Sequence, residues 1–173
     1  MVRVFLKSII LFFICISSGV YAMGLSDVGK VCLFSGMSGV VKLDGKPVSG
    51  ARLVRTVKKD KKNADETVTD ENGYFEFKPK FERTITKYLP MEFVVSQQID
   101  VLYQDGKVEM WSGVKRESEE NTESRGEPLI VECELGSEEG LKVVNGSPIF
   151  SLCKWDAEPD PKIDLEMIMK RGY

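Results

Sequence analysis

Hydrophobic and polar residues alternate with a period of two along most of this chain, which is the pattern of half-buried β-strands. The alternating runs are short, and glycine-containing turns separate them. We expect strands at Val31–Phe34, Gly39–Leu43, Ala51–Val57, Thr67–Thr69, Tyr74–Phe77, Ile99–Tyr103, Lys107–Trp111, Leu129–Leu135 and Ile149–Trp155. The pattern predicts an all-β fold, an antiparallel β-sandwich of roughly seven to nine short strands.

Turn residues support this prediction. Asp44-Gly45 and Asp105-Gly106 each supply the positive φ that a tight hairpin turn needs. The run Asp70–Gly73 predicts an Asx turn, in which a side-chain oxygen of Asp70 or Asn72 accepts backbone N–H bonds. A calcium loop is the alternative for this run, but it would need further oxygen ligands and a bidentate glutamate at its end.

Two segments lack a clean alternation. Residues Phe81–Leu89 mix apolar and charged positions, which predicts an irregular crossover with one helical turn before Pro90. Residues Lys115–Pro128 contain no large apolar side chain. Burial therefore cannot offset the entropy lost on ordering them, and we expect a long mobile loop.

The C-terminal segment, residues 161–171, carries two conflicting signals. Lys162–Met169 alternates polar and apolar residues, which indicates a strand. Asp160-Pro161 followed by good helix formers indicates the start of a helix. We predict a strand here, with a helix as the alternative.

The runs Gly39–Ala51 and Thr69–Phe75 together resemble the carboxypeptidase regulatory-like module, a small transthyretin-like β-sandwich. We place this module at about residues 36–80, and we place the second hairpin and the C-terminal strands of the same domain at residues 93–170. The resemblance implies a transthyretin-like fold and a non-catalytic accessory, adhesive or binding role. No peptidase domain is recognisable in the sequence, so the regulatory role of the namesake modules is not implied.

The first 22 residues have the three parts of a secretory signal. Arg3 and Lys7 form a positive region, Ser8–Ile16 an apolar core, and Val20–Ala22 a cleavage site. The apolar core is much shorter than the roughly 20 residues of a membrane-spanning helix. We therefore predict a cleaved signal peptide at residues 1–22, a single domain at residues 23–173, and a periplasmic location.

Net charge narrows the range of partners. Without Arg3 and Lys7 the chain keeps 22 basic and 27 acidic side chains, a net charge of −5. Nucleic-acid binding depends on a cationic surface, so nucleic acid is not expected as a partner. An acidic protein is compatible with a partner that presents a basic surface.

Three cysteines follow the predicted signal: Cys32, Cys133 and Cys153. Export to an oxidising compartment favours a disulfide, and the odd count leaves one free thiol. Cys133 and Cys153 lie in two strand-like runs that could be paired neighbours, so we predict that these two are bonded. A bridge from Cys32 to either of them is the alternative, since spacing alone does not show which Cα atoms lie close enough.

The sequence contains no histidine, which excludes Ser-His-Asp and Cys-His catalysis and histidine-based zinc sites. Carboxylates are abundant, but they cluster where solvated loops are expected. No nucleophile elbow, Walker loop or dinucleotide-binding motif is present after the signal. We expect no catalytic residues, no metal and no cofactor. A hydrolase that uses carboxylates alone is the remaining enzymatic alternative.

Protein recognition is the function that these observations favour. The expected contact residues belong to the glutamate-rich loop, the basic hairpin tip and one strand end: Glu117, Glu119, Glu120, Glu123, Lys58, Lys59, Lys61, Lys62 and Trp111. We predict a non-enzymatic periplasmic protein-binding module, for example an immunity-type inhibitor of a secreted bacterial toxin. A structural or adhesive envelope component is the alternative.

Overall fold

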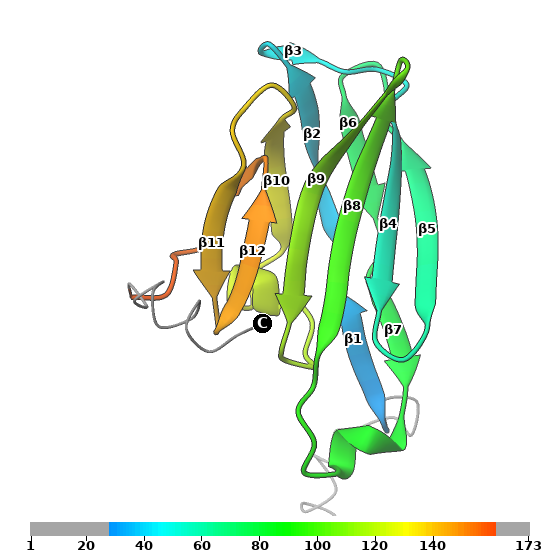
Figure 1. The fold of residues 1–173 in the computed structure, drawn as a ribbon, viewed down its shortest axis with the longest axis vertical. Helices are drawn as coiled ribbons and strands as arrows, with labels where there is room; N and C mark the ends of the chain where they lie inside the picture. Colours follow the sequence, from blue (N-terminus) through cyan, green and yellow to red (C-terminus); the bar gives the residue numbers. More distant parts are fainter. Residues whose placement is uncertain (1–27, 162–173) are drawn as a thin grey trace, which may run out of the picture.

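The computed structural model describes residues 28–161 (Figure 1). The predicted signal peptide and the C-terminal segment from residue 162 onward lie outside the described residues. No α-helix occurs within residues 28–161, which contain strands and two short 3₁₀ helices. The strands are β1 (Lys30–Phe34), β2 (Met37–Leu43), β3 (Lys46–Pro47), β4 (Arg52–Lys58), β5 (Lys62–Val68), β6 (Tyr74–Phe77), β7 (Lys80–Arg83), β8 (Val95–Tyr103), β9 (Gly106–Lys115), β10 (Leu129–Glu134), β11 (Gly140–Val144), β12 (Ser147–Ser151) and β13 (Cys153–Trp155). The 3₁₀ helices are η2 (Ile85–Tyr88) and η3 (Thr122–Ser124).

These strands form a β-sandwich, as the alternating pattern predicts. One layer is a six-stranded antiparallel sheet in the order β11-β12-β9-β8-β4-β5. The second layer has the order β13-β10-β2, and both β3 and β6 pair with the other side of β2. Figure 1 shows the two layers facing each other, with β2, β6 and β10 behind the six-stranded sheet. One pairing departs from the antiparallel prediction, because β2 and β10 run parallel.

Strands β1 and β7 extend the second layer. Phe34 pairs with Lys80 in β1–β7, and Met37 pairs with Phe77 in β2–β6. The register is therefore the same on both sides of Ser35, and the four strands form one long two-stranded ribbon. Residues 81–89 were predicted to form an irregular crossover. This is wrong for residues 81–83, which belong to strand β7. The predicted helical turn is confirmed as η2.

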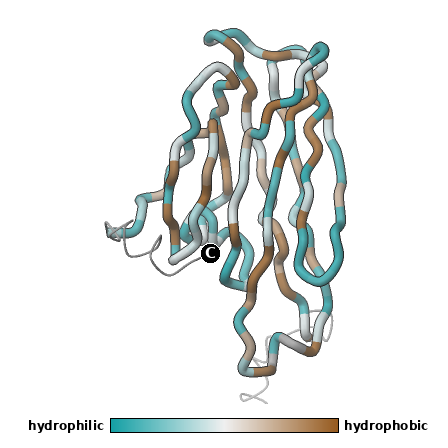
Figure 2. Tube along the Cα trace, in the orientation of Figure 1, coloured by the Kyte–Doolittle hydropathy of each residue, from teal (hydrophilic) through white to brown (hydrophobic). Residues whose placement is uncertain are grey.

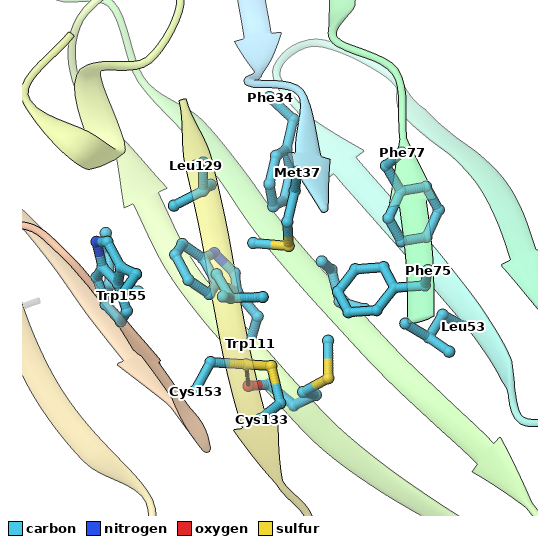
Figure 3. Packing of buried hydrophobic residues seen from close by; sticks show 14 of the residues in the cluster. Phe34, Met37, Leu53, Phe75, Phe77, Trp111, Leu129, Cys133, Cys153 and Trp155 are labelled. Carbon is cyan, nitrogen blue, oxygen red and sulfur yellow. Dashed lines mark hydrogen bonds between the residues drawn. A yellow bond between two sulfur atoms is a disulfide. The ribbon is translucent and has the colours of Figure 1, made fainter. Parts of the chain in front are cut away.

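Aromatic side chains fill the space between the sheets (Figure 3). Trp111 is fully buried, with its ring centroid 6.1 Å from that of Phe34 and 5.0 Å from that of Trp155. Phe75 and Phe77 are two residues apart on β6, so both side chains face the same side of the sheet and point into this core. The core thus joins residues of both layers.

An arginine closes one open side of the sandwich. Arg55 lies on the inward face of β4 and is 1% exposed. Its guanidinium donates to both carboxylate oxygens of Asp65 on β5, at 3.1 and 2.6 Å, and to the carbonyl of Lys78, at 2.8 Å. It also lies over the ring of Phe77. The guanidinium therefore connects the edge strand β5 of one layer to the chain just after β6 of the other layer.

The predicted turns occur with one shift. Asp44 and Gly45 have φ values of 51° and 74°, as a tight hairpin turn requires. The carboxylate of Asp70 accepts from the backbone N–H groups of Asn72 and Tyr74, at 2.8 and 2.9 Å, which confirms the Asx turn. The second hairpin turns one residue earlier than predicted.

The earlier turn follows from the pairing of β8 with β9. Tyr103 pairs with Gly106, so Gln104 and Asp105 are the central residues of the turn. A β-bulge at Met110 shifts the register of the two strands by one residue. Because the bulge interrupts the alternation of β9, the adjacent residues Met110 and Trp111 are both buried.

The disulfide prediction is confirmed, because Cys133 and Cys153 are bonded with an S–S distance of 2.02 Å. They pair across β10 and β13. The run Ile149–Trp155, predicted as one strand, is divided between the two sheets: β12 pairs with β9, whereas β13 pairs with β10. The switch occurs at Leu152, whose N–H donates to the carbonyl of Met110 and whose carbonyl accepts from the N–H of Glu134.

Candidate functional site

A groove of about 400 Å³ lies on the outer face of the second layer, beside strand β6. Its floor comes from β2 and β6, and its far wall comes from the segment that precedes β10. The lining residues are Gly36, Met37, Ser38, Tyr74, Glu76, Phe77, Lys78, Pro79, Glu120, Asn121, Pro128 and Leu129. The groove is open to solvent and joins an edge strand to a loop.

The strand period determines which side chains of β6 reach this groove. Phe75 and Phe77 point inward and are buried, so Tyr74 and Glu76 point outward and are exposed. Tyr74 is 43% exposed, so part of its side chain is accessible for contact. Ile130 lies two strands away on the same outer face and is 64% exposed. The surface therefore combines apolar side chains with carboxylates.

The far wall belongs to the segment predicted as a mobile loop, and that prediction is corrected. The segment is held to the core by Glu123, whose side chain is 2% exposed. The Oε2 atom of Glu123 lies 2.7 Å from Nζ of Lys115, whose side chain is 1% exposed. Lys115 also donates to the hydroxyl of Thr122 in η3. The sequence lacks apolar groups here, but a buried charge pair takes their place.

Other groups complete the surroundings of the Glu123 carboxylate. The hydroxyl of Ser35 donates to Oε2 at 2.5 Å, and Nε2 of Gln97 donates to Oε1 at 2.8 Å. The indole N–H of Trp155 donates to the backbone carbonyl of Glu123 at 2.9 Å. Residues from β8, β9 and the β1–β2 junction thus converge on the Glu123 side chain, and Trp155 of β13 binds its backbone. A buried polar network that is satisfied in this way rigidifies the segment that it holds.

Electrostatics keeps Glu123 ionised. Burial raises the pKa of Glu123, but the adjacent Lys115 ammonium and the hydrogen bonds from Ser35 and Gln97 outweigh burial and hold that pKa below its usual range. The free thiol of Cys32 lies close to this network. Burial raises the pKa of Cys32 to about 11, so the thiol stays protonated and unreactive at neutral pH. This cluster is suited to a structural role.

A second ion pair fixes the other end of the same segment. The guanidinium of Arg125 lies 2.6 Å from a carboxylate oxygen of Asp160. The same carboxylate accepts from the backbone N–H groups of Asn145 and Gly146, at 3.0 and 2.7 Å. Residues 116–128 are therefore attached to the β11–β12 turn as well as to the core.

The structure places the predicted contact residues in two different environments. Glu117, Glu119 and Glu120 are exposed on the ordered segment, and Lys58, Lys61 and Lys62 are exposed at the β4–β5 tip. Lys59 is 12% exposed and pairs with Glu82 of β7 at 2.9 Å.

Two of the predicted contact residues require correction. Trp111 and Glu123 are buried, so neither side chain is available to a partner. Trp111 packs at the centre of the sandwich, and Glu123 is fully engaged with Lys115 and its neighbours. Among the predicted residues, only Glu120 lines the groove.

Sequence reasoning missed Tyr74 and Glu76 as groove residues, and it missed Lys115 and Gln97 as partners of Glu123. The partners of Glu123 could have been identified from the alternation of inward and outward positions along β8 and β9. Lys115 shares the inward phase of Trp111, and Gln97 shares that of Ile99. A polar residue at an inward position needs a buried partner.

The groove offers carboxylates and apolar groups but no cluster of buried titratable side chains. The groove carboxylates Glu76 and Glu120 are both exposed to solvent. Within residues 28–161, no group of three or more cysteine, aspartate or glutamate side chains is arranged to hold a metal ion. In the same residues, no helix has the length and apolar character needed to cross a membrane.

A family described as a domain of unknown function (DUF6795) matches residues 37–138, which is more than half of the chain. The chain belongs to the DUF6795 family. The searches of curated proteins and of solved structures find no match. The DUF6795 segment runs from β2 through β10 and includes Tyr74, Glu76, Lys115 and Glu123. Both walls of the groove, and the ion pair that orders one of them, therefore lie mainly within the family segment.

Proposed function

We propose that this protein is a non-enzymatic, exported binding module that holds a basic segment of another protein in the groove beside β6. The observation that carries the proposal is that an acidic wall of the groove is ordered in advance by the buried Lys115–Glu123 ion pair. A binding surface that is already ordered loses less conformational entropy when a partner binds.

Charge supports a basic partner. Glu76 and Glu120 line the groove together with one basic residue, Lys78, and Glu117 and Glu119 are exposed on the same ordered segment as Glu120. Lys115 is buried and neutralises Glu123, so the exposed part of this segment remains acidic. Complementary charge mainly raises the association rate and selects against acidic partners.

Apolar groups of the same face supply contact area. The ring of Tyr74 and the exposed side chain of Ile130 lie next to the carboxylates on the outer face of the second layer. Tyrosine is enriched among residues that dominate interface energies. An apolar anchor surrounded by charged residues is the usual arrangement of a protein-binding site.

One concrete form of this function is an immunity-type inhibitor that blocks a toxin secreted between bacteria. The support is the predicted export signal, the net acidic charge and a rigid surface suited to protein recognition. We also propose that residues 36–80 are related to the carboxypeptidase regulatory-like module. The Asp44-Gly45 hairpin and the Asx turn at Asp70 support this relationship, since they lie in the runs Gly39–Ala51 and Thr69–Phe75 that carry the resemblance.

The test uses the partner that co-purifies from the native envelope, identified by mass spectrometry. The double variant Glu119→Lys/Glu120→Lys should weaken the complex by about tenfold or more, and added salt should reduce the difference from wild type. Glu138→Lys/Glu139→Lys is the matched control, because both residues are exposed outside the groove and the change in net charge is the same. Equal losses in the two variants, or no loss in the first, would remove the groove from the interface.

A further inference from the structure

Strand β5 is an open edge of the six-stranded sheet. It pairs with β4 over all seven of its residues, and no other strand of residues 28–161 pairs with it. Figure 1 shows β5 at the outer margin of this sheet. Its inward-facing acid, Asp65, is paired with Arg55 and Lys80. Prolines, bulges and unpaired inward charges usually block pairing at a sheet edge, and β5 has none of them.

The other edges of the two layers are occupied or short. On β11, at the opposite edge of the same sheet, the carbonyl of Val143 accepts from the backbone N–H of Asp160 at 2.7 Å. On β6, both backbone groups of Tyr74 are hydrogen-bonded to Asp70. Strand β13 has only three residues. The longest strand edge left open between residues 28 and 161 is therefore that of β5.

One hydrogen bond shows which backbone groups of β5 point to this open edge. The N–H of Thr69 donates to the carbonyl of Ala51 at 2.9 Å, and the β4–β5 pairing continues in the same register. Hydrogen-bonded pairs alternate with non-bonded pairs along an antiparallel ladder. Residues 63, 65 and 67 therefore bond to β4, and the backbone groups of residues 62, 64, 66 and 68 point away from it. The side chains of these last four residues are exposed.

We propose that two copies of this chain pair antiparallel through β5, with Ala64 opposite Ala64 of the second copy at a two-fold axis. In this register Lys62 of each copy lies opposite Glu66 of the other. Opposite charges directly across an antiparallel pair stabilise it, and the small Ala64 side chains leave room at the axis. A lysine on an edge strand usually opposes pairing, but here it meets a glutamate. The two six-stranded sheets then form one continuous sheet.

The charges of β5 select this register. The second copy must pair through the same four outward residues, so the axis passes through a residue of the strand. An axis at Lys62 or Glu66 would place like charges opposite each other, and an axis at Asp65 would place two carboxylates there. An axis at Asn63 would place Lys62 opposite Ala64, without an ion pair. Among axes within β5, only the one at Ala64 joins lysine to glutamate.

The polarity of β5 favours a second copy over a strand of another protein. Figure 2 shows mostly hydrophilic colouring along this strand. Sites that add a strand of another protein take their specificity from side-chain pockets, and no residue of β5 lines the groove beside β6. Its own sequence supplies the complementary charges instead. Pairing through β5 and partner binding in the groove use different residues, so either can fail without the other.

The test is analytical ultracentrifugation of the chain that begins at Met23, which contains the whole described domain. Two paired edge strands form a small interface, so the wild type should dimerise with a Kd on the order of 100 µM. Lys62→Glu and Glu66→Lys each place like charges opposite each other and should weaken the dimer by about tenfold or more. Lys46→Glu, at an exposed position of β3, should leave it unchanged.

An equimolar mixture of the two β5 variants provides the sharpest result. Glutamates at 62 and 66 of one chain then lie opposite lysines at 66 and 62 of the other, so the mixture should associate with about the wild-type affinity. Glu66 also pairs with Arg52 of its own chain at 3.2 Å. The mixture does not restore that pair in Glu66→Lys, so its recovery reports on pairing between copies alone.

Cross-linking provides a second measurement. Ala64→Cys should form a disulfide-linked dimer on oxidation, because a hydrogen-bonded antiparallel pair holds its Cα atoms about 5.5 Å apart, within reach of a disulfide. Val68→Cys, exposed on the same strand but opposite residue 60 of the second copy, should cross-link about tenfold more slowly. The proposal is overturned if the wild type stays monomeric up to about ten times the expected Kd. Equal cross-linking of the two cysteine variants would also overturn it, as would a mixture of Lys62→Glu and Glu66→Lys that stays monomeric.

Discussion

The Nζ atom of Lys115 lies 2.7 Å from Oε2 of Glu123, and the two side chains are 1% and 2% exposed. Lys115 ends strand β9, and Glu123 lies in η3, within a segment that has no large apolar side chain. The ion pair therefore holds this segment against the core, as hydrophobic burial holds the strands. It also fixes Glu120 and Asn121 as the wall of the groove.

Replacing Lys115 by Met should lower the free energy of unfolding by about 3–5 kcal/mol, because it leaves Glu123 as a buried charge without its cation. Lys115→Met/Glu123→Leu should lose less than the single variant, since no unpaired charge then remains buried at this site. Urea denaturation measures both values. Arg52→Met is the control, because Arg52 pairs with Glu66 at the surface, where an ion pair contributes less than about 1 kcal/mol.

Stability should fall in acid through Glu123. Its folded-state pKa lies below the usual value of 4.5, so its contribution is complete above that value and is lost as the pH falls through the lower folded-state pKa. Glu123→Gln should therefore lower the free energy of unfolding at pH ~7 and flatten its decline below pH ~4.5. Denaturation at a series of pH values measures this. The same acid dependence in the variant and the wild type would contradict the role of Glu123.

The disulfide should contribute about 3 kcal/mol, because it closes a loop of some 20 residues between Cys133 and Cys153. The double variant Cys133→Ala/Cys153→Ala removes the bond without leaving an unpaired thiol at either position. Its urea midpoint should fall relative to wild type under non-reducing conditions. Reducing agent should then shift the midpoint of the wild type but leave that of the variant unchanged.

Cys32 should be the only reactive thiol of the chain that begins at Met23, and only after unfolding. Its side chain is buried and its pKa is raised to about 11, so both access and thiolate formation are suppressed. Ellman's reagent should titrate one thiol in denaturant and almost none in buffer. Rapid reaction of the folded protein would show that the β1 region opens under native conditions.

Gly39 should tolerate no side chain. A Cβ atom at this position would lie 2.0 Å from the carbonyl oxygen of Val131, within the parallel β2–β10 pair. Gly39→Ala should therefore cost at least about 3 kcal/mol of stability, the upper end for an overpacked site. Gly45→Ala is the control, because its Cβ would meet open space and only the positive φ opposes it, at about 1 kcal/mol. Thermal or urea unfolding compares the two.

Alternation was sufficient to predict the layers of this fold. The runs that contain Val41, Leu53, Phe75 and Val101 place these side chains in the core as expected. The parallel pairing of β2 with β10 was not predictable, because a local pattern does not specify which distant strand is the neighbour. The division of residues 149–155 between two sheets was missed for a related reason, since both halves alternate in the same phase.

The candidate site was less predictable than the fold. The glutamates of residues 117–123 look alike in sequence, yet three are exposed and Glu123 is buried. The difference depends on Lys115 and Gln97, polar residues at inward positions of two strands, which precede Glu123 by 8 and 26 residues. Composition indicated disorder for the segment, whereas the buried Lys115–Glu123 ion pair orders it. The groove residues Tyr74 and Glu76 could be found only once the neighbours of β6 were known.

Leu152 connects the two layers through a single residue, since its N–H binds Met110 in one sheet and its carbonyl binds Glu134 in the other. The strands on either side of it, β12 and β13, pair with β9 and β10, and both of them lie beyond residue 138, where the family match ends. A chain trimmed to residues 37–138 would uncover a border of each sheet at once and invite intermolecular strand pairing. Recombinant production should therefore extend at least to Pro161.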